Sequence, residues 1–424
     1  MAISRWYYKS RPNQAIAPGS GTFNATGTAV KTNSIAKTPH TKRPLFYLVD
    51  WLPPDFGAVG QYGLFFSREY AEGGREVHLI GLSSSASSVV TENFAKGLLR
   101  VTRLRATPFR KTSSIQRLLW AVRTNSQLVW AVIKDPDSRN AELLFTGSPP
   151  FMLYFSFLAK ALRGCRLIYR ITDFYPEVLL AAWGRKPLLL RPIERITWFL
   201  RKHVDEFQVL GEDQRRRLLV GGIDPRRISL KRDVAPVAIS ANEAPARRPA
   251  ELQGFRVILY SGNFGVAHDV ATIREGLLRH HREGSRRFGL WLNASGSAVD
   301  DLATSLRDEG IPVAVSPPCS LDALPGVLAA ADVHLISLKA NFAGYVLPSK
   351  LYGCLSSKSP ILFVGPKSSD VHLLCDEDPT LLYRQVNNGD VEAFALALED
   401  LADRRRRTDD RERNLTSAAD TERA

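Results

Sequence analysis

Residues 345–366, YVLPSKLYGCLSSKSPILFVGP, place a hydroxyl and a cation where a helix is expected to begin. Ser349 and Lys350 follow a proline, and the pattern predicts a helix over 349–357 and then a buried strand. A helix N-terminus leaves several backbone N–H groups unpaired and carries about half a positive charge. With a hydroxyl and an ammonium group added, this helix end suits a diphosphate. The structural alternative is that Ser349 only caps the helix and Lys350 points to water.

A glycine turn lies further upstream, in YSGNFGVAHDV (260–270). A strand is expected to end there, followed by a turn at Gly262, Asn263 and Gly265 and by a helix that begins near His268. A backbone that carries no side chains can approach a phosphate group closely. The spacing differs from the GxGxxG fingerprint of dinucleotide-binding proteins, so the turn alone does not identify a nucleotide site.

The segments around these motifs alternate between strands and helices. PLFYLVDWL (44–52), a glycine loop, a helix over about 64–72 and GGREVHLIGLSS predict a parallel strand–helix–strand unit. The alternation breaks at a Pro- and Ala-rich segment and restarts at FRVILYSGN. The sequence therefore predicts an α/β protein with two Rossmann-like domains and a cleft at the carboxyl ends of their strands. The expected parts are a disordered basic arm (1–43), a first domain (44–235), a linker (236–254), a second domain (255–402) and a charged tail (403–424).

Composition limits the class of protein. The net charge of +14 indicates an anionic partner, but no nucleic-acid-binding motif is present, so nucleic acid is not expected. The four cysteines form no CxxC pair and the eight histidines show no ligand spacing, so neither a metal site nor a disulfide scaffold is expected. The acidic motifs DPD (135–137) and DED (376–378) are expected to be loop or cap residues. Cysteine usage, with no apolar leader and no long apolar window, favours a cytoplasmic protein.

Two segments combine basic with aromatic and aliphatic residues. They are FRKTSSIQRLLWAVRTNSQLVWAVIK (109–134) and RKPLLLRPIERITWFLRK (185–202). Helices of this kind can lie on anionic lipid. They can equally pack their apolar face on a sheet and leave the cations solvated, and the sequence leaves both alternatives open.

Together these motifs resemble a known family. YSGNFGVAHDV, AADVHLISL, GYVLPSKLYG and PILFVGP are similar to the donor-binding half of bacterial family 4 glycosyltransferases, of the colanic-acid, exopolysaccharide and O-antigen type. YLVDWLPPDFGAVGQY, FTGSPPF and RITDFYPEVLLAAWG resemble the other half, so the resemblance covers about residues 44–400. It implies the GT-B fold, with two Rossmann-like domains that face each other across a cleft.

The resemblance also implies a reaction. A nucleotide-diphosphate sugar serves as co-substrate, without a further cofactor or a metal, and the sugar passes to a lipid-linked saccharide with retention of configuration. The departing phosphate would accept the acceptor's proton, so that no general base is required. The protein would act in surface polysaccharide biosynthesis, peripheral on the cytoplasmic side of the inner membrane.

The same resemblance assigns residues by their place in the motifs. The catalytic set is Lys350, Asp173 and Glu177. The loop at the acceptor side of the cleft contributes Gly57, Gly60 and Gln61. The donor-binding residues are Gly262, Asn263, Gly265, His268, Lys339, Ser349, Lys350 and Tyr352.

The sequence departs from the family pattern at two places. Gly353 stands where many members have a glutamate that binds the nucleotide ribose, and Asn263 and His268 stand near the positions of an arginine and a lysine. The first departure motivates an alternative, a catalytically inactive GT-B scaffold subunit of a polysaccharide complex. A nucleotide-sugar epimerase is a further alternative with the same two-domain architecture.

Overall fold

The computed structural model describes residues 43–403, except 56, 109–113, 185–190, 241–242, 297 and 402. The expected N-terminal arm (but for Arg43) and the expected tail (but for Asp403) lie outside the described residues. The strands are β1 Leu45–Trp51, β2 Glu76–Ser83, β3 Ser88–Asn93, β4 Leu98–Arg105, β5 Glu142–Thr146, β6 Arg166–Ile171, β7 Glu206–Val209, β8 Ile228–Leu230, β9 Arg256–Asn263, β10 Phe288–Ser295, β11 Val313–Ser316, β12 Val333–Ser337, β13 Ile361–Val364 and β14 Tyr383–Val386.

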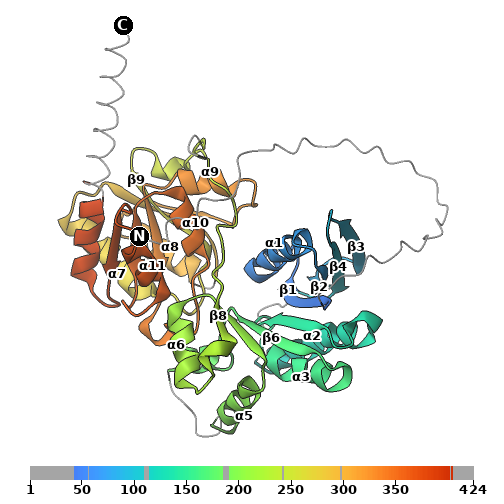
Figure 1. Ribbon diagram of the computed structural model, residues 1–424. Coiled ribbons are helices and arrows are strands. Elements are labelled where there is room, and N and C mark those ends of the chain that lie inside the picture. The colour runs from blue at the N-terminus through green and yellow to red at the C-terminus, as the bar shows by residue number, and fades with distance from the viewer. Residues whose placement is uncertain are drawn as a thin grey trace, which may run out of the picture. The chain divides into compact units, whose positions relative to one another are not determined.

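Helices connect these strands (Figure 1). The α-helices are α1 Ala58–Glu72, α2 Ser114–Lys134, α3 Met152–Arg163, α4 Glu177–Trp183, α5 Arg191–Lys202, α6 Glu212–Val220, α7 Val270–Glu283, α8 Val299–Arg307, α9 Leu324–Ala329, α10 Lys350–Ser357 and α11 Asp370–Asp376. Short 3₁₀ helices are η1 Pro136–Ser138, η3 Pro225–Arg227, η4 Ala250–Leu252 and η5 Ala340–Phe342.

The strands form two separate sheets. The first has the order β3-β4-β2-β1-β5-β6-β7-β8 and the second has the order β11-β10-β9-β12-β13-β14. Every pair of neighbours is parallel except β3 and β4, which are antiparallel. The predicted α/β architecture with two parallel sheets is therefore confirmed. The antiparallel strand β3 at the edge was not predicted, because its residues are largely exposed and lack a buried run.

Alternating residues of each central strand explain why helices cover both faces. In β1, Phe46 and Leu48 pack in the same cluster as residues of α2 and α3, whereas Tyr47 and Val49 pack in the cluster that includes residues of α1. Strand β9 behaves in the same way in the second sheet, where Ile258 packs with α7 and α8 on one face. Parallel strands buried on both faces appear as continuous apolar runs, which is the pattern that the sequence shows.

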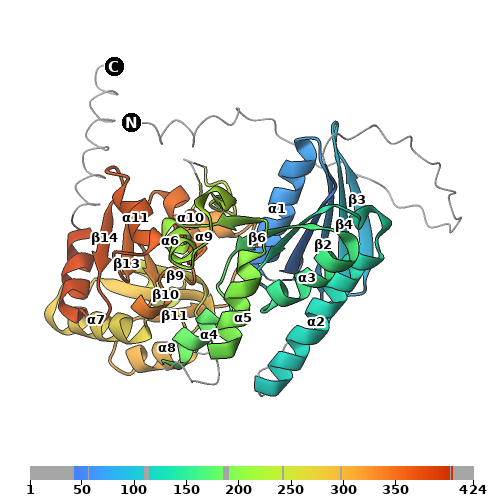
Figure 2. The ribbon, with the colours of Figure 1, turned by 60° about the horizontal axis from the view of Figure 1, so that its bottom comes forward.

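Both sheets reverse their strand order at one point. In the first sheet β1 lies between β2 and β5, and in the second β9 lies between β10 and β12. Crevices outside the carboxyl ends of strands at such switch points are where open α/β sheets bind ligands. Figure 2 views the two sheets and their helices from a second direction.

Helix α1 begins at Ala58, six residues before the predicted start at Leu64. The predicted start was too late because glycines occupy the first turns of the helix and are unfavourable in helices. One of these glycines is nevertheless required for packing. A Cβ atom on Gly60 would lie 1.8 Å from the carbonyl oxygen of Trp51, so only glycine lets α1 approach the end of β1 this closely. Among the described residues, no helix is long and apolar enough to cross a membrane.

Backbone contacts join the two halves beside the switch points. The N–H of Phe174 donates to the carbonyl of Tyr345 at 3.0 Å, and Asp173 forms an isolated antiparallel bridge with Val346. The loop after β6 is thereby fixed to the segment that leads into α10. Arg170 of β6 also pairs with Asp233, 2.5 Å between Nη2 and Oδ1, where the chain leaves the first sheet.

Candidate active site

A cavity of about 510 Å³ lies at the carboxyl ends of the strands of both sheets. Its lining combines residues that follow β1 and β6 with residues that follow β9, β10 and β12. Eight of the residues predicted from sequence line it: Gly57, Gln61, Asp173, Gly262, Asn263, His268, Ser349 and Lys350. These eight residues come from widely separated parts of the chain.

Lys350 is the most unusual of these residues. Its Nζ atom is buried and has no hydrogen-bond partner among the described residues, and it lies 3.2 Å from the centroid of the Tyr260 ring. Burial lowers the pKa of this amine well below its usual value. A buried amine without a counter-ion costs free energy, and an anion bound in the cavity would remove that cost.

The turn after β9 brings backbone close to this lysine. Gly262 has φ of +116°, which favours glycine, and a Cβ atom there would lie 3.8 Å from the Cε atom of Lys350. Ser349 precedes α10 and makes no side-chain cap, so the purely structural role considered for its hydroxyl is not observed. The start of α10, the glycine turn and the amine thus meet at one place.

His268 enters the same part of the cavity as a neutral side chain. Its Nδ1–H donates to the carbonyl of Ser337 at 2.6 Å. Burial, followed by the charge of Lys350, lowers the pKa of His268 to about 3. This histidine therefore adds a dipole near the amine and no second positive charge near neutral pH.

Two carboxyl groups lie at the ends of β1 and β6: Asp173 lines the cavity, and Asp50 lies behind the part of the wall that Gly57 forms. Burial, followed by the charge of Asp50, raises the pKa of Asp173 to about 7. Burial raises the pKa of Asp50 to about 6, although the hydroxyl of Ser148 donates to its Oδ2 atom at 2.8 Å. No hydrogen-bond partner of Asp50 Oδ1 occurs among the described residues. Near neutral pH this wall therefore holds carboxyl groups that bind protons unusually well.

Other predicted residues lie outside the lining. The carboxylate of Glu177 is held by buried Arg201, with 2.8 Å between Nη2 and Oε2, so this placement does not support the predicted catalytic role. Its position four residues after Asp173 suggested the cleft, but Glu177 begins α4 and points to α5 instead.

Lys339 and Tyr352 are also absent from the lining. The Nζ atom of Lys339 donates to the carbonyl of Val266 at 3.0 Å, on the outside of the glycine turn. Tyr352 is buried in α10, and its hydroxyl has no hydrogen-bond partner among the described residues. Neither placement supports a contact with the donor.

Gly60 and Gly265 do not line the cavity either, and they contribute to its shape through their backbone. Gly60 permits the close packing of α1 on β1, and a Cβ atom on Gly265 would lie 3.4 Å from the Nδ2 atom of Asn263. The two glycines shape loops whose neighbours Gly57 and Asn263 do line the cavity.

Gly353 lies in an apolar part of the lining. A Cβ atom at this position would meet Leu328 Cδ1 at 3.2 Å and Pro236 Cδ at 4.0 Å. Leu321 and Leu324 line the same cavity. A side chain at this position would therefore require only a small shift of Leu328, into surroundings that are mainly apolar.

Sequence reasoning missed several residues of the first half. Tyr47, Arg170 and Thr172 line the cavity, and Asp50 lies directly behind Gly57. A usable signal was present, because Asp50 and Thr172 are polar residues at the carboxyl ends of otherwise apolar strands. Thr172 Oγ1 is buried and lacks a hydrogen-bond partner among the described residues, so it is open to a polar ligand.

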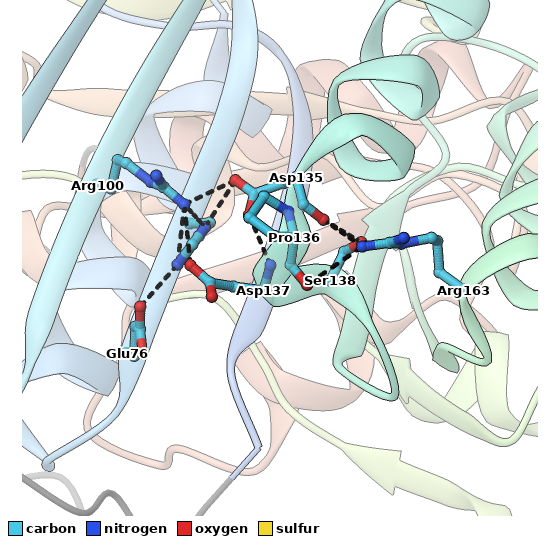
Figure 3. Close-up of polar contacts among 8 residues, drawn as sticks. Glu76, Arg100, Asp135, Pro136, Asp137, Ser138 and Arg163 are labelled. Carbon is cyan, nitrogen blue, oxygen red and sulfur yellow. Dashed lines mark hydrogen bonds and ion pairs between the residues drawn. The ribbon is translucent and has the colours of Figure 1, made fainter. Parts of the chain in front are cut away.

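A possible metal-binding group lies elsewhere in the described part of the chain. Glu76, His78 and Asp137 present ligand atoms within 4.8 Å of one another. Figure 3 shows that Arg100 reaches into this group, where its Nη2 atom lies 2.7 Å from Asp135 Oδ2 and also contacts His78. A guanidinium therefore occupies the place of a cation. The DPD motif belongs to this network, and Asp135 caps η1 as predicted, accepting from the N–H of Asp137.

Two Rossmann-like sheets whose switch points open into one shared cavity define the GT-B fold. Comparison with solved structures gives the same fold. E. coli trehalose-6-phosphate protein bound with UDP-2-fluoro glucose has a TM-score of 0.55 at 12% identity, and 84% of this chain and 90% of that chain are covered. WaaG, a glycosyltransferase involved in lipopolysaccharide biosynthesis, has a TM-score of 0.54 at 13% identity, with the same coverage of 84% and 90%. The predicted GT-B fold is confirmed.

Sequence comparison gives one named relative. The chain is 25% identical over 252 residues to the probable glycosyltransferase WbjE of Pseudomonas aeruginosa, a match that covers 57% of this chain and 61% of that protein. The chain thus matches about three fifths of the length of this curated relative. No family model matches the sequence.

Proposed function

We propose that this chain is a glycosyltransferase that moves a sugar from a nucleotide-diphosphate-sugar donor to a lipid-linked saccharide in surface polysaccharide biosynthesis. The similarity to the probable glycosyltransferase WbjE and the GT-B fold support the reaction class. The observation that carries the proposal is the buried, unpartnered amine of Lys350 at the start of α10. A diphosphate supplies the negative charge that this amine and the helix N-terminus lack.

The arrangement favours loss of the diphosphate as the step that the protein assists. The bond between the anomeric carbon and the phosphate oxygen breaks, and its electron pair leaves with the nucleotide. Lys350 and the N–H groups of α10 stabilise that charge in a buried site, where each such donor contributes about 3 kcal/mol or more. The acceptor oxygen forms the new bond with retention of configuration, as the resemblance implies, and releases its proton.

A donor-binding screen tests the proposal. The purified full chain is heated with UDP, GDP, dTDP and their sugars, beside Lys350→Ala and the matched control Lys339→Ala. A ligand present at about 100 times its dissociation constant stabilises the fold by about 2.7 kcal/mol. We expect one nucleotide to stabilise wild type and Lys339→Ala but not Lys350→Ala. If none stabilises the wild type, the proposed donor site is wrong.

The scaffold alternative has one observation in its favour, the replacement of a ribose-binding glutamate by Gly353. Release of UDP, GDP or dTDP from a donor sugar in the presence of the chain would exclude an inactive scaffold. An epimerase is recognised by conversion of the nucleotide sugar with no acceptor present and no free nucleotide released. The configuration of the transferred sugar, read by NMR on the product, tests retention.

Docking on the cytoplasmic face of an anionic membrane completes the proposal, and an exposed apolar surface supports it. Helix α2 packs against α3, and α3 packs against α5, on one side of the first sheet (Figure 2). Large apolar side chains are exposed along all three helices: Ile115, Leu118, Leu119, Val122, Trp130, Leu158, Leu162, Ile193, Ile196 and Phe199. Arg117, Arg123, Arg191, Arg195 and Lys202 are exposed on the same helices. We call this the α2–α3–α5 face.

In the two segments for which membrane docking and packing on the sheet were both considered, some of the apolar residues are exposed and others are buried. Leu119, Trp130 and Phe199 are exposed, whereas Leu128 is buried and Trp198 packs against Gly221. Residues 109–113 and 185–190 lie outside the described part of the chain. Exposed apolar residues beside cations are the combination that binds anionic lipid surfaces.

Vesicle flotation tests the α2–α3–α5 face. We expect wild type to float with vesicles of phosphatidylglycerol and phosphatidylethanolamine but not of phosphatidylcholine. The double variant Ile196→Ser/Phe199→Ser should lose most of this binding. Val220→Ser removes a still more exposed apolar residue, from α6, and should bind as wild type does. Equal binding by all three proteins would refute the assignment of this face.

A further inference from the structure

One part of the cavity has an apolar wall, formed by the loop after β11, by α9 and by the segment between β8 and β9. Six residues line the cavity there: Pro318, Cys319, Leu321, Leu324, Leu328 and Pro236. We call these six residues the α9 wall. Leu321 is exposed and Leu324 is half-buried, although both are apolar. A ligand that covered them would remove apolar surface from water, which favours binding.

The α9 wall carries no carboxylate. Among the described residues that line the cavity, the acids are Asp173 and Asp233, and both precede the second sheet in the chain. Asp233 is already paired with Arg170. A carboxylate is the usual partner of a ribose 2′-hydroxyl in Rossmann-like domains. The described lining from residue 236 onward offers no such partner.

The side chain of Asn293, which also lines the cavity, is engaged within the protein. Its Nδ2 atom donates to Ser316 Oγ at 3.0 Å and to the carbonyl of Pro317 at 2.7 Å, and its Oδ1 atom accepts from Ser261 at 3.2 Å. Both N–H donors of this amide are therefore used, and Asn293 does not replace the carboxylate as a partner for ribose.

Helix α10 places the α9 wall next to the proposed diphosphate site. Gly353 follows Lys350 by three residues, and residues three apart are neighbours on a helix, with about 5–6 Å between their Cβ atoms. A Cβ atom on Gly353 would lie 3.2 Å from Leu328 Cδ1 and 4.0 Å from Pro236 Cδ, so this side of α10 faces the wall. A nucleoside attached to a diphosphate at Lys350 therefore reaches the wall within one helical turn.

The first half of the chain gives the lining a different character. Gln61, Thr172 and Asp173 line the cavity there, and Thr172 Oγ1 is buried without a hydrogen-bond partner among the described residues. A sugar carries several hydroxyl groups and requires polar partners, whereas a nucleoside presents apolar faces. The two parts of a nucleotide sugar therefore match the two halves of the lining.

We propose that the donor is a thymidine-diphosphate sugar, whose 2′-deoxyribose and base methyl group lie against the α9 wall. The inference rests on the proposed glycosyl transfer and names the class of donor that it uses. A ribose hydroxyl buried on this wall without a partner weakens binding, and an apolar pocket disfavours an added hydroxyl by up to about 100-fold. The thymine methyl group adds apolar area and favours binding about fourfold. Gly353 then marks a change of nucleoside and not a loss of activity.

Calorimetric titration of the purified full chain with UDP, dUDP and dTDP tests the proposal. UDP and dUDP differ only in the 2′-hydroxyl, and dUDP and dTDP differ only in the base methyl group. We expect dUDP to bind at least as tightly as UDP, and dTDP to bind about fourfold more tightly than dUDP. Tighter binding of UDP than of dUDP, or binding of dTDP no tighter than that of dUDP, would overturn the inference.

The same titration separates this inference from the proposed function. Binding of GDP alone would overturn the thymidine donor and leave the proposed glycosyl transfer in place. If none of the four nucleotides binds, the proposed donor site itself is wrong.

The position of the nucleoside is tested at Cys319. This cysteine is half-buried and lines the cavity, whereas Cys165, Cys354 and Cys375 are buried. Alkylation of Cys319 by iodoacetamide, located by mass spectrometry, should slow severalfold when dTDP is bound. Pyrophosphate should not slow it, because it covers the diphosphate site alone. Equal alkylation with and without bound dTDP would place the nucleoside elsewhere and overturn the inference.

A carboxylate added at Gly353 gives the reverse test. Gly353→Glu places an acceptor beside the α9 wall and should make UDP bind about tenfold more tightly than dUDP. Gly353→Ala adds only a Cβ atom and should keep the wild-type order of affinities. Asp322→Asn changes an exposed acid that adjoins Leu321 but lies outside the lining, and it should keep the same order. Loss of UDP binding in Asp322→Asn would show that this carboxylate binds ribose, and the inference would be wrong.

Discussion

The two ends of the first sheet both contain charged residues, but only some of those at the carboxyl end have partners. At the amino ends of β2 and β4, Arg100 contacts His78 and Asp135, so the charges there have partners (Figure 3). At the carboxyl ends of β1 and β6, Asp50 and Asp173 are partly buried, and no cation pairs with either among the described residues. An unpaired buried charge costs stability, whereas a paired one roughly breaks even. Among the described residues of the first sheet, Asp50 and Asp173 lack such partners at the end where the cavity lies, close to the paired charges of Arg170 and Asp233.

The comparison separates two uses of the same residue types. Paired charges hold elements together, and removal of one partner should cost stability without affecting the cavity. Unpaired charges are available to a ligand, and their removal should cost function with little loss of stability. Arg201 and Arg100 belong to the paired group, whereas Asp50 and Asp173 belong to the unpaired group.

The largest effect is expected at Arg201, the buried partner of Glu177. Arg201→Met leaves the Glu177 carboxylate buried without its cation, which should lower the free energy of unfolding by about 3–5 kcal/mol. Denaturant unfolding measures this loss. The double variant Arg201→Met/Glu177→Gln should recover part of it, since no uncompensated charge then remains. If Arg201→Met were as stable as wild type, the distinction between paired charges that stabilise the fold and unpaired charges that serve the cavity would be wrong.

A smaller loss is expected at the amino end of the sheet. Arg100→Met removes the shared partner of His78 and Asp135, and we expect a loss of about 2 kcal/mol because the arginine is partly exposed. The nucleotide thermal shift should match that of wild type. Arg226→Met, which breaks a solvent-exposed pair with Asp224, should change neither quantity. A weakened nucleotide response in Arg100→Met would show that this end of the sheet also serves the cavity.

The smallest effect is a change in how stability depends on pH. A carboxyl whose pKa is higher in the folded than in the unfolded protein binds more protons when folded, so its contribution to stability falls as pH rises through that interval. The pKa values of about 6 and about 7 for Asp50 and Asp173 place this interval between about pH 4 and pH 7. Between pH 5.5 and pH 7.5, Asp50→Asn/Asp173→Asn should therefore lose less stability than wild type. Denaturant unfolding at both values checks this, and identical losses in the two proteins would contradict it.

Much of the architecture was accessible from sequence because parallel strands buried on both faces leave continuous apolar runs. PILFV and PLFYLV show such runs, and Pro-Ser-Lys marks the start of α10 within one residue. The antiparallel edge strand β3 was not accessible. It is largely exposed, and its pairing with β4 depends on the neighbouring strand rather than on its own pattern.

The site was predictable where one short motif determines it and not where distant residues do. Lys350 was found because its helix start is local. Asp50 was missed because its character depends on Ser148, which is 98 residues away, and on Asp173. Glu177 was assigned to the cleft because it follows Asp173 closely, yet one turn of helix directs it to Arg201, a partner that lies 24 residues further along the chain.

The backbone joint between the loop after β6 and the segment before α10 also bears on how such proteins can be recombined. Phe174 is bonded to Tyr345, and the Nδ2 atom of Asn341 donates to the carbonyl of Ala181 at 2.8 Å. A chimera that takes its whole second sheet from a relative would bring in a foreign partner for both contacts. A crossover that keeps residues 341–347 with the first half preserves them. The part of the chain that can be exchanged between relatives therefore does not coincide with either sheet. Hybrid libraries should place their crossovers so that residues 341–347 stay with the first half.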